Sequence, residues 1–323
     1  MHPRTGELLI PCPFPDRSSP HGEDAAAYVR EVAAEVGIRG RAETMVLHGM
    51  ALGEAAALTY PDADIGRLRV AALWIAFLVL FDDAWSDLRS LEGDWLPPVL
   101  DQHRAVERVL KGRPATATDD PLVRLLARLL SDITDLAPGW EDTRLRQEIG
   151  RYLAGTLWEL DLRSRGRVAD LTTYLRMRRY FSTMTVQLEL DYFVCRLSLP
   201  ERVRTHPCVR LVDAAVADYA CIANDLYSYE AERENGLAQN VIPVLRHEFG
   251  WDEDRAWSHA LRLCARALRT FTDVRDRLSR YGIEPDERTR RYFEHYEAFM
   301  SAAVRWPARS ERYRSDATGF VHP

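Results

Sequence analysis

Paired cysteine motifs are absent from this sequence. The five cysteines are odd in number and widely spaced, and no two of them form a Cys-x-x-Cys pair. Secreted disulfide scaffolds carry cysteines in even sets, so we interpret these five as reduced thiols of a cytoplasmic protein. The N-terminus also lacks the basic start and continuous apolar stretch of a secretory signal. Export is therefore not predicted.

Long hydrophobic runs are also lacking. The longest, from Val70 to Phe81, has twelve residues, whereas a helix that spans a membrane needs about 20 apolar residues. We therefore interpret this run as a buried helix and expect no membrane span.

Signatures of nucleic-acid and nucleotide binding are missing as well. The 49 acidic and 43 basic residues are interspersed and give a net charge of −6, so no basic stripe is available for nucleic acid. No Gly-x-Gly or Gly-Lys-Ser/Thr loop occurs, which argues against a nucleotide site. A di-iron helical bundle is excluded because none of the nine histidines follows a glutamate by three residues.

What the sequence does contain is a succession of helical patterns. Apolar residues recur at helical spacing between glycine and proline breaks, and no stretch alternates as a strand would. We expect an all-α fold with a single domain over residues 1–323, an extended N-terminal strap over residues 1–22 and a disordered tail over residues 314–323. The expected helices cover roughly residues 25–36, 41–59, 64–87, 97–110, 120–135, 141–164, 170–197, 206–233, 238–249, 253–281 and 286–304.

The apolar run from Val70 to Phe81 ends in three carboxylates, Asp82, Asp83 and Asp87. Buried carboxylates this close together repel one another and lose hydration, which costs several kcal/mol per ion unless a cation compensates. Asp83 and Asp87 lie about 40° apart on one helical face, whereas Asp82 is turned about 100° from Asp83. The cluster is interpreted either as a divalent metal site or as a helix cap or solvated loop.

A second set of oxygen-bearing side chains lies on the helix expected over residues 206–233. Asn224, Ser228 and Glu232 are spaced by four residues, so each is turned by about 40° and displaced by about 6 Å from the one before. A carboxamide oxygen, a hydroxyl and a carboxylate suit Mg²⁺ and leave coordination positions for water and phosphate oxygens. Taken alone, the row could also be a polar surface face.

Together, the two motifs resemble the aspartate-rich motif and the Asn/Ser/Glu triad of class I terpene synthases, particularly the bacterial terpene cyclases. The resemblance spans nearly the whole chain and implies the isoprenoid synthase fold, a helical bundle around a central apolar cavity. It also implies a lyase that ionises a linear prenyl diphosphate and cyclises the carbocation to a terpene hydrocarbon or alcohol.

The resemblance further implies three Mg²⁺ ions with bound substrate, for which Mn²⁺ can substitute. It makes Asp82 the main ligand on one side, with support from Asp83 and Asp87. Asn224, Ser228 and Glu232 would hold the third ion on the opposite side.

Two further features of the family can be placed on the chain. Arg178 resembles the arginine that senses the diphosphate, and its neighbour Arg179 is the alternative. Arg312 and Tyr313 resemble the closing Arg-Tyr pair. An arginine can bind phosphate oxygens through two hydrogen bonds, and a tyrosine hydroxyl can donate one more. We therefore expect Arg178, Arg312 and Tyr313 to bind the substrate diphosphate.

Aromatic side chains are expected to line the cavity, because the face of a ring attracts a cation by about 0.5 to 2 kcal/mol. Plain core packing is the alternative for each of them. The cavity residues assigned from position are Phe77, Phe81, Phe181, Ser182 and Trp306.

The sequence departs from the family pattern at two places. Phe181 and Ser182 stand where the family has its linker and effector residues, and the linker is often polar. Ala231 stands where a lysine or arginine is common, and Arg233 is the substitute available nearby.

Farnesyl diphosphate is the favoured substrate by analogy with family members of similar length, and geranylgeranyl diphosphate is the alternative. A chain-elongating prenyltransferase shares the bundle but typically carries two aspartate-rich motifs, and only one is found here. A non-catalytic helical binding protein is the remaining alternative, in which both motifs are merely solvated. A homodimer is compatible with these patterns.

Overall fold

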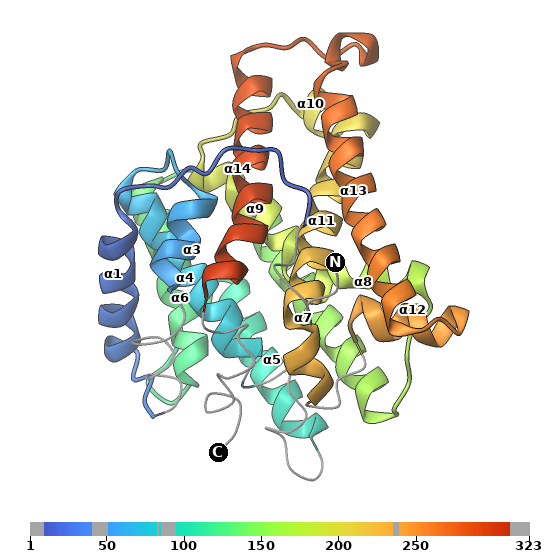
Figure 1. Cartoon of the computed structure of the whole chain (residues 1–323). Coiled ribbons are helices and arrows are strands. Elements are labelled where there is room, and N and C mark those ends of the chain that lie inside the picture. The colour runs from blue at the N-terminus through green and yellow to red at the C-terminus, as the bar shows by residue number, and fades with distance from the viewer. Residues whose placement is uncertain (1–9, 41–50, 83, 85–94, 235–238, 311–323) are drawn as a thin grey trace.

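The computed structural model describes residues 10–40, 51–82, 84, 95–234 and 239–310, and within these ranges all regular structure is helical (Figure 1). The prediction of an all-α fold is confirmed. The helices are α1 (Gly22–Glu35), α3 (Leu52–Thr59), α4 (Ile65–Phe81), α5 (Leu96–Leu110), α6 (Pro121–Leu136), α7 (Thr143–Ser164), α8 (Leu171–Phe181), α9 (Met184–Val194), α10 (Glu201–Arg204), α11 (Pro207–Glu234), α12 (Val241–Phe249), α13 (Glu253–Arg275), the 3₁₀ helix η4 (Leu278–Tyr281) and α14 (Glu287–Arg309).

Helix α4 lies inside the bundle, as its sequence predicts. It is apolar on nearly every side, so it can be stable only where other helices surround it. Helices α1, α3, α6 and α9 pack against it, and side chains from Leu68 to Phe81 along its length are buried. Asp64 caps its first turn by accepting a hydrogen bond from the backbone N–H of Arg67 (3.1 Å). The helix therefore carries Asp82, its C-terminal cap residue, to a fixed place at the far end.

The second half of the core is built around α11. This helix packs against α13 and α14, and also against α8, α9 and α12. Large side chains from these helices, among them Tyr219, Phe271 and Tyr296, are buried together. Because α11 is held on several sides, the polar residues near its C-terminal end are carried on a rigid element.

The strap, which is described from Ile10, lies across the second half of the bundle (Figure 1). Tyr219 on α11 donates a hydrogen bond to the carbonyl of Pro11 (2.7 Å), and Ser301 on α14 donates one to the carbonyl of Pro15 (3.1 Å). The ring of Phe14 packs edge-on against Phe271. The strap is therefore bound to α11, α13 and α14.

Two predicted helices are wrong in extent. The pattern over residues 170–197 predicted one helix, but α8 and α9 are separate because Thr183 adopts a left-handed conformation (φ 64°) that a helix of L-residues cannot continue. The pattern over residues 253–281 also predicted one helix. Here α13 ends at Arg275, and the chain tightens into η4 before Gly282 (φ 70°) ends it.

The cysteines and the apolar helices agree with the sequence analysis. All five cysteines are free. No helix in the described ranges is long and apolar enough to cross a bilayer. The part of the predicted helix over residues 41–50 and the predicted tail over residues 314–323 lie outside the description.

Candidate active site

The oxygen row on α11 is partly engaged by neighbouring side chains. The Asn224 Oδ1 atom accepts a hydrogen bond from Arg178 Nη2 (2.8 Å), and Glu232 Oε2 accepts one from Asn240 Nδ2 (2.8 Å). Between them, the hydroxyl of Ser228 is buried and lies within hydrogen-bonding reach of Glu232, whose pKa it lowers. The three oxygen-bearing side chains therefore form a continuous row along α11.

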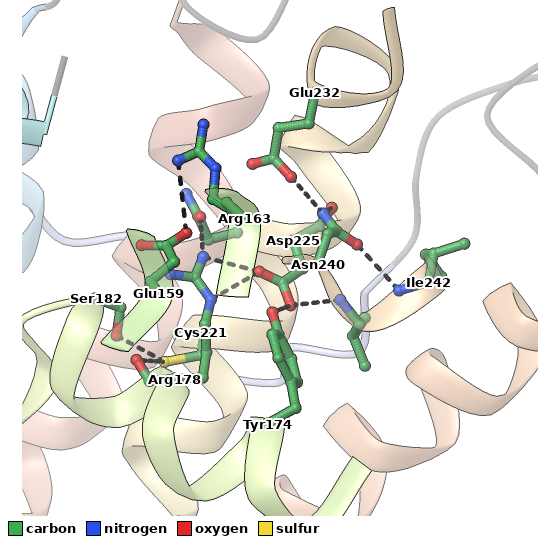
Figure 2. A network of polar contacts seen from close by, with 12 residues as sticks. Glu159, Arg163, Tyr174, Arg178, Ser182, Cys221, Asp225, Glu232, Asn240 and Ile242 are labelled. Atoms are coloured by element: carbon green, nitrogen blue, oxygen red, sulfur yellow. Dashed lines mark hydrogen bonds and ion pairs between the residues drawn. The ribbon is translucent and has the colours of Figure 1, made fainter. Parts of the chain in front are cut away.

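Arg178 is held in place by a buried carboxylate (Figure 2). Its Nε donates to Asp225 Oδ1 (2.9 Å) while its Nη2 reaches Asn224. Asp225 is fully buried, and its Oδ2 accepts from the hydroxyl of Tyr174 and from the backbone N–H of Val241 (3.0 Å). Burial by itself would lower the pKa of Arg178, but Asp225 raises it well above its usual value. The guanidinium is therefore charged and fixed beside Asn224.

The neighbouring arginine points elsewhere. Arg179 forms a two-bond ion pair with Asp218 (2.6 and 2.8 Å). Of the two candidates for the diphosphate sensor, only Arg178 is directed at the oxygen row.

Two residues at the α8–α9 break lie close to Arg178. The guanidinium carbon of Arg178 is 5.0 Å from the centre of the Phe181 ring, which places charge over a π face. The backbone N–H of Ser182 donates to the carbonyl of Arg178 (3.0 Å), and its hydroxyl lies 3.1 Å from Cys221 Sγ. Phe181, which replaces a polar linker, thus contacts Arg178 through its ring.

A carboxyl on α7 connects the two predicted metal-binding helix ends. Glu159 is buried, and burial is the main reason that its pKa rises to about 8. The carboxylates of Asp82 on α4 and Glu232 on α11 raise it further, against the opposing effects of Arg163 and Arg178. Asp82 and Glu232 therefore both lie within electrostatic reach of one carboxyl group.

The region carries more negative charge than its cations balance. Burial, followed by the nearby charge of Asp225, raises the pKa of Glu232 as well. Within the described residues, no three acidic, histidine or cysteine side chains are gathered as a metal site by themselves. The row on α11 adds carboxamide and hydroxyl oxygens, which are hard ligands of the kind that Mg²⁺ takes. The raised pKa of Glu232, which burial causes in the first place, fits a row that can receive a cation.

Comparison with known proteins identifies the family. The model of terpene synthase family 2, C-terminal metal binding, matches residues 73–270, which is more than half of the chain. The chain belongs to the terpene synthase family. As a member it is a terpene synthase, a lyase, and the matched segment contains both Asp82 and the row on α11.

Relatives of this terpene synthase match it over almost its whole length. A 10-epi-cubebol synthase of Sorangium cellulosum is 30% identical over 305 residues, which cover 94% of this chain and 96% of that protein. A (+)-T-muurolol synthase of Roseiflexus castenholzii, named as (2E,6E)-farnesyl diphosphate cyclizing, is 26% identical over 301 residues, 93% of this chain and 92% of that protein.

A solved structure agrees in fold. The linalool/nerolidol synthase of Streptomyces clavuligerus superposes with a TM-score of 0.79 at 23% identity and covers 93% of this chain and 100% of that one. The bundle therefore has the isoprenoid synthase fold of class I terpene synthases, as predicted.

Not every predicted site residue can be placed in this terpene synthase. Asp83, Asp87, Arg312 and Tyr313 lie outside the described residues. Phe77 and Phe81 are completely buried on α4, where their rings contact each other (5.2 Å between centroids). Trp306 is partly buried near the end of α14. Arg233, the substitute considered for a basic residue at position 231, is exposed and pairs with Glu230.

The sequence patterns did not identify four residues that surround Arg178 and the row on α11, namely Glu159, Tyr174, Asp225 and Asn240. None belongs to a spaced motif. A signal existed for Glu159, because it falls on the face of α7 that also buries Tyr152, Thr156 and Leu160. An acidic residue on an apolar face is rarely buried without a function or a partner. Asp225 gave a similar signal, since it lies between Ala223 and Leu226.

Proposed function

We propose that the chain is a magnesium-dependent terpene cyclase that works in the cytoplasm. Its substrate is a linear prenyl diphosphate, with farnesyl diphosphate favoured and geranylgeranyl diphosphate as the alternative. The enzyme ionises this substrate, cyclises the carbocation to a terpene hydrocarbon or alcohol, and releases diphosphate. The printed substrate of the Roseiflexus castenholzii relative supports the choice of farnesyl diphosphate.

The observation that carries this proposal is the convergence of charged groups around Glu159. Asp82 and Glu232 lie 150 residues apart in the sequence, yet the charges of both raise the pKa of the same buried carboxyl. Asp82, Asn224, Ser228 and Glu232 would hold Mg²⁺, with Asp83 and Asp87 as further ligands of the aspartate-rich motif. Bound magnesium supplies fixed positive charge where the departing diphosphate develops negative charge.

Arg178 contributes the protein's own charge to this step. Its guanidinium is fixed by Asp225, so little reorganisation is needed when it donates hydrogen bonds to a diphosphate oxygen. Arg312 and Tyr313 would donate from the end of the chain. The ring of Phe181, which lies against Arg178, restricts the directions in which the guanidinium can turn.

The hydrocarbon part of the substrate needs walls that exclude water and tolerate a cation. Phe77, Phe81 and Trp306 would provide aromatic faces, each worth about 0.5 to 2 kcal/mol to a neighbouring cation. These aromatic side chains offer no basic or nucleophilic group to trap the cation early.

The direct test is incubation of the purified protein with C10, C15, C20 and C25 prenyl diphosphates and Mg²⁺, followed by mass spectrometry of hexane extracts. We expect a cyclic product from the C15 substrate and none after addition of EDTA. Asn224→Ala should abolish diphosphate release. Arg144→Gln, which removes an exposed ion pair with Glu201, is the matched control and should release diphosphate at the wild-type rate.

Two outcomes would contradict the proposal. Formation of only longer, linear prenyl diphosphates in the presence of isopentenyl diphosphate would indicate a chain-elongating prenyltransferase. Failure to release diphosphate from any substrate would indicate a non-catalytic binding protein.

A further inference from the structure

A second buried polar cluster lies near the other end of α4, about 25 Å from Asp82 along a helix of this length. We call it the His295 cluster, and it comprises Tyr60, Gln187, Asp191, Cys195 and His295. Asp191 is fully buried. Its Oδ1 accepts from the hydroxyl of Tyr60 (2.7 Å) and from Gln187 Nε2 (3.1 Å). Its Oδ2 lies 3.1 Å from His295 Nε2.

The other ring nitrogen of His295 faces a thiol. His295 Nδ1 is 3.2 Å from Cys195 Sγ, and the imidazole stacks on the ring of Tyr60 at 5.4 Å with an interplanar angle of 9°. Burial alone would lower the pKa of His295, but Cys195 and Asp191 raise it well above its usual value. The imidazole thus lies between a carboxylate and a sulfur, with one ring nitrogen close to each, and a histidine next to a cysteine can take the proton of that nucleophile.

Cys195 lies beside a cavity. Cys195 is the C-terminal cap residue of α9 and is partly exposed. Cys195 and His295 both line a cavity of about 240 Å³, which has room for roughly eight water molecules. A molecule the size of an amino acid can therefore lie next to Cys195 and His295. Nothing in the cyclase proposal uses this cavity, because its residues lie at the end of α4 away from Asp82.

The rim of the cavity favours an anionic ligand. Its three carboxylates, Asp62, Asp64 and Glu294, are each bonded to an arginine. Arg291, which is exposed on the same rim, donates instead to the backbone carbonyl of Cys195 (2.8 Å). Its charge is therefore not bonded to a carboxylate in the described structure, and it lies beside the residue that carries the thiol.

We propose that Cys195 is a reactive thiol that exchanges with small, carboxylate-bearing disulfides admitted through this cavity. Its sulfur attacks one sulfur of the disulfide and forms a new S–S bond with that half. The original S–S bond breaks, and its electron pair leaves with the other half as a thiolate. That thiolate takes up the proton that Cys195 gave to His295 Nδ1. Cys195 is thereby oxidised and the leaving half is reduced, so atoms, electrons and protons balance.

The test is a competition among the cysteines of the native protein. The protein is treated with limiting 3,3′-dithiodipropionate, quenched, digested, and each cysteine is quantified by mass spectrometry. Cys195 should react at least ten times faster than Cys12 and Cys208, which are also partly exposed and serve as internal controls. Equal rates for these three residues would overturn the proposal.

Two variants separate the imidazole and the rim from general loss of structure. His295→Asn should remove the advantage of Cys195, whereas His259→Asn, a change on α13 outside the cluster, should not. A folded His295→Asn protein that keeps the advantage would refute the role of His295.

Arg291→Gln changes an exposed side chain and should leave the fold intact. It should slow the dianionic reagent about threefold without changing the rate of neutral bis(2-hydroxyethyl) disulfide, and equal effects on both would refute the rim. These experiments need neither Mg²⁺ nor a prenyl diphosphate. Their failure would therefore leave the cyclase proposal untouched.

Discussion

Two buried aspartates, one on α9 and one on α11, lie toward opposite ends of α4 and are held by different partners. At one end, Asp191 accepts from Tyr60 and Gln187 and faces His295. At the other end, Asp225 accepts from Tyr174 and Arg178, and we call this group, together with Glu159, Glu232 and Asn240, the Arg178 cluster.

The difference lies in what surrounds each aspartate. The Arg178 cluster contains two further carboxyl groups, the buried Glu159 and the half-buried Glu232, and the pKa values of both are raised by desolvation and by neighbouring negative charge. The His295 cluster contains a single carboxylate, which lies 3.1 Å from a ring nitrogen of His295. The additional carboxyl groups, which lie beside carboxamide and hydroxyl oxygens, therefore distinguish the cluster that can receive metal ions from the His295 cluster.

The largest expected effect is on turnover. Glu232→Gln keeps the size of the side chain but removes the charge of a proposed metal ligand, so kcat should fall about 10³-fold, in the range seen for loss of one preorganised electrostatic group. Steady-state kinetics over a range of Mg²⁺ concentrations would measure this. A loss below tenfold would show that Glu232 is not needed to hold the metal.

Ligand binding at the Arg178 cluster should stabilise the folded protein, whereas the His295 cluster should not contribute to this effect. Mg²⁺ and diphosphate together, at about 100 times their dissociation constant, should add about 2.7 kcal/mol to the free energy of unfolding and raise the melting temperature by several degrees. Glu232→Gln should lose most of this shift, as measured by calorimetry. An equal shift in the variant would place the ligands elsewhere.

Tyr60 and Tyr174 play equivalent parts in the two clusters, because each donates a hydrogen bond to the buried aspartate. Tyr60→Phe and Tyr174→Phe each remove a hydroxyl from a buried aspartate, so each should lower the free energy of unfolding by about 1–3 kcal/mol in urea titrations. Only Tyr174→Phe should also reduce kcat, because Asp225 positions Arg178. A loss of kcat in Tyr60→Phe at full folding would contradict this separation.

The last effect concerns the dependence of stability on pH. Glu159 keeps its proton in the folded, metal-free chain up to a pKa of about 8, against 4.5 when unfolded. The folded state binds more protons between these values, so stability should fall as pH rises, by at most about 1.4 kcal/mol per pH unit, and level off above pH 8. Glu159→Gln should remove this slope. Glu31→Gln, an exposed change on α1, should keep it.

The helices could be predicted because their signals are local. Apolar spacing and proline or glycine breaks identified α4, α6, α11 and most others to within a few residues. The α8–α9 break was missed because neither proline nor glycine marks it, and only the backbone of Thr183 shows the left-handed turn. Such a conformation is imposed by tertiary packing, which no residue pattern along the chain records.

The candidate site was only half predictable for a related reason. The acidic cluster that begins at Asp82 and the row that begins at Asn224 each lie within a few residues of sequence, so a local pattern was enough to predict them. Glu159 and Asp225 are single residues whose importance depends on partners from other helices. A carboxyl at an unmarked position becomes informative only when burial and neighbouring charges are known.

The strap also binds the C-terminal end of α14. The carbonyl of Phe14 accepts from Arg305 (2.9 Å), and Asp16 pairs with Arg309 (2.7 Å), only a few residues before Arg312 and Tyr313. The strap therefore fixes the last turns of α14, which lead to Arg312 and Tyr313, the pair expected to bind the diphosphate. Deletion of the strap would remove these two contacts and leave the end of α14 less ordered. Catalysis should then weaken although Arg312 and Tyr313 themselves are unchanged.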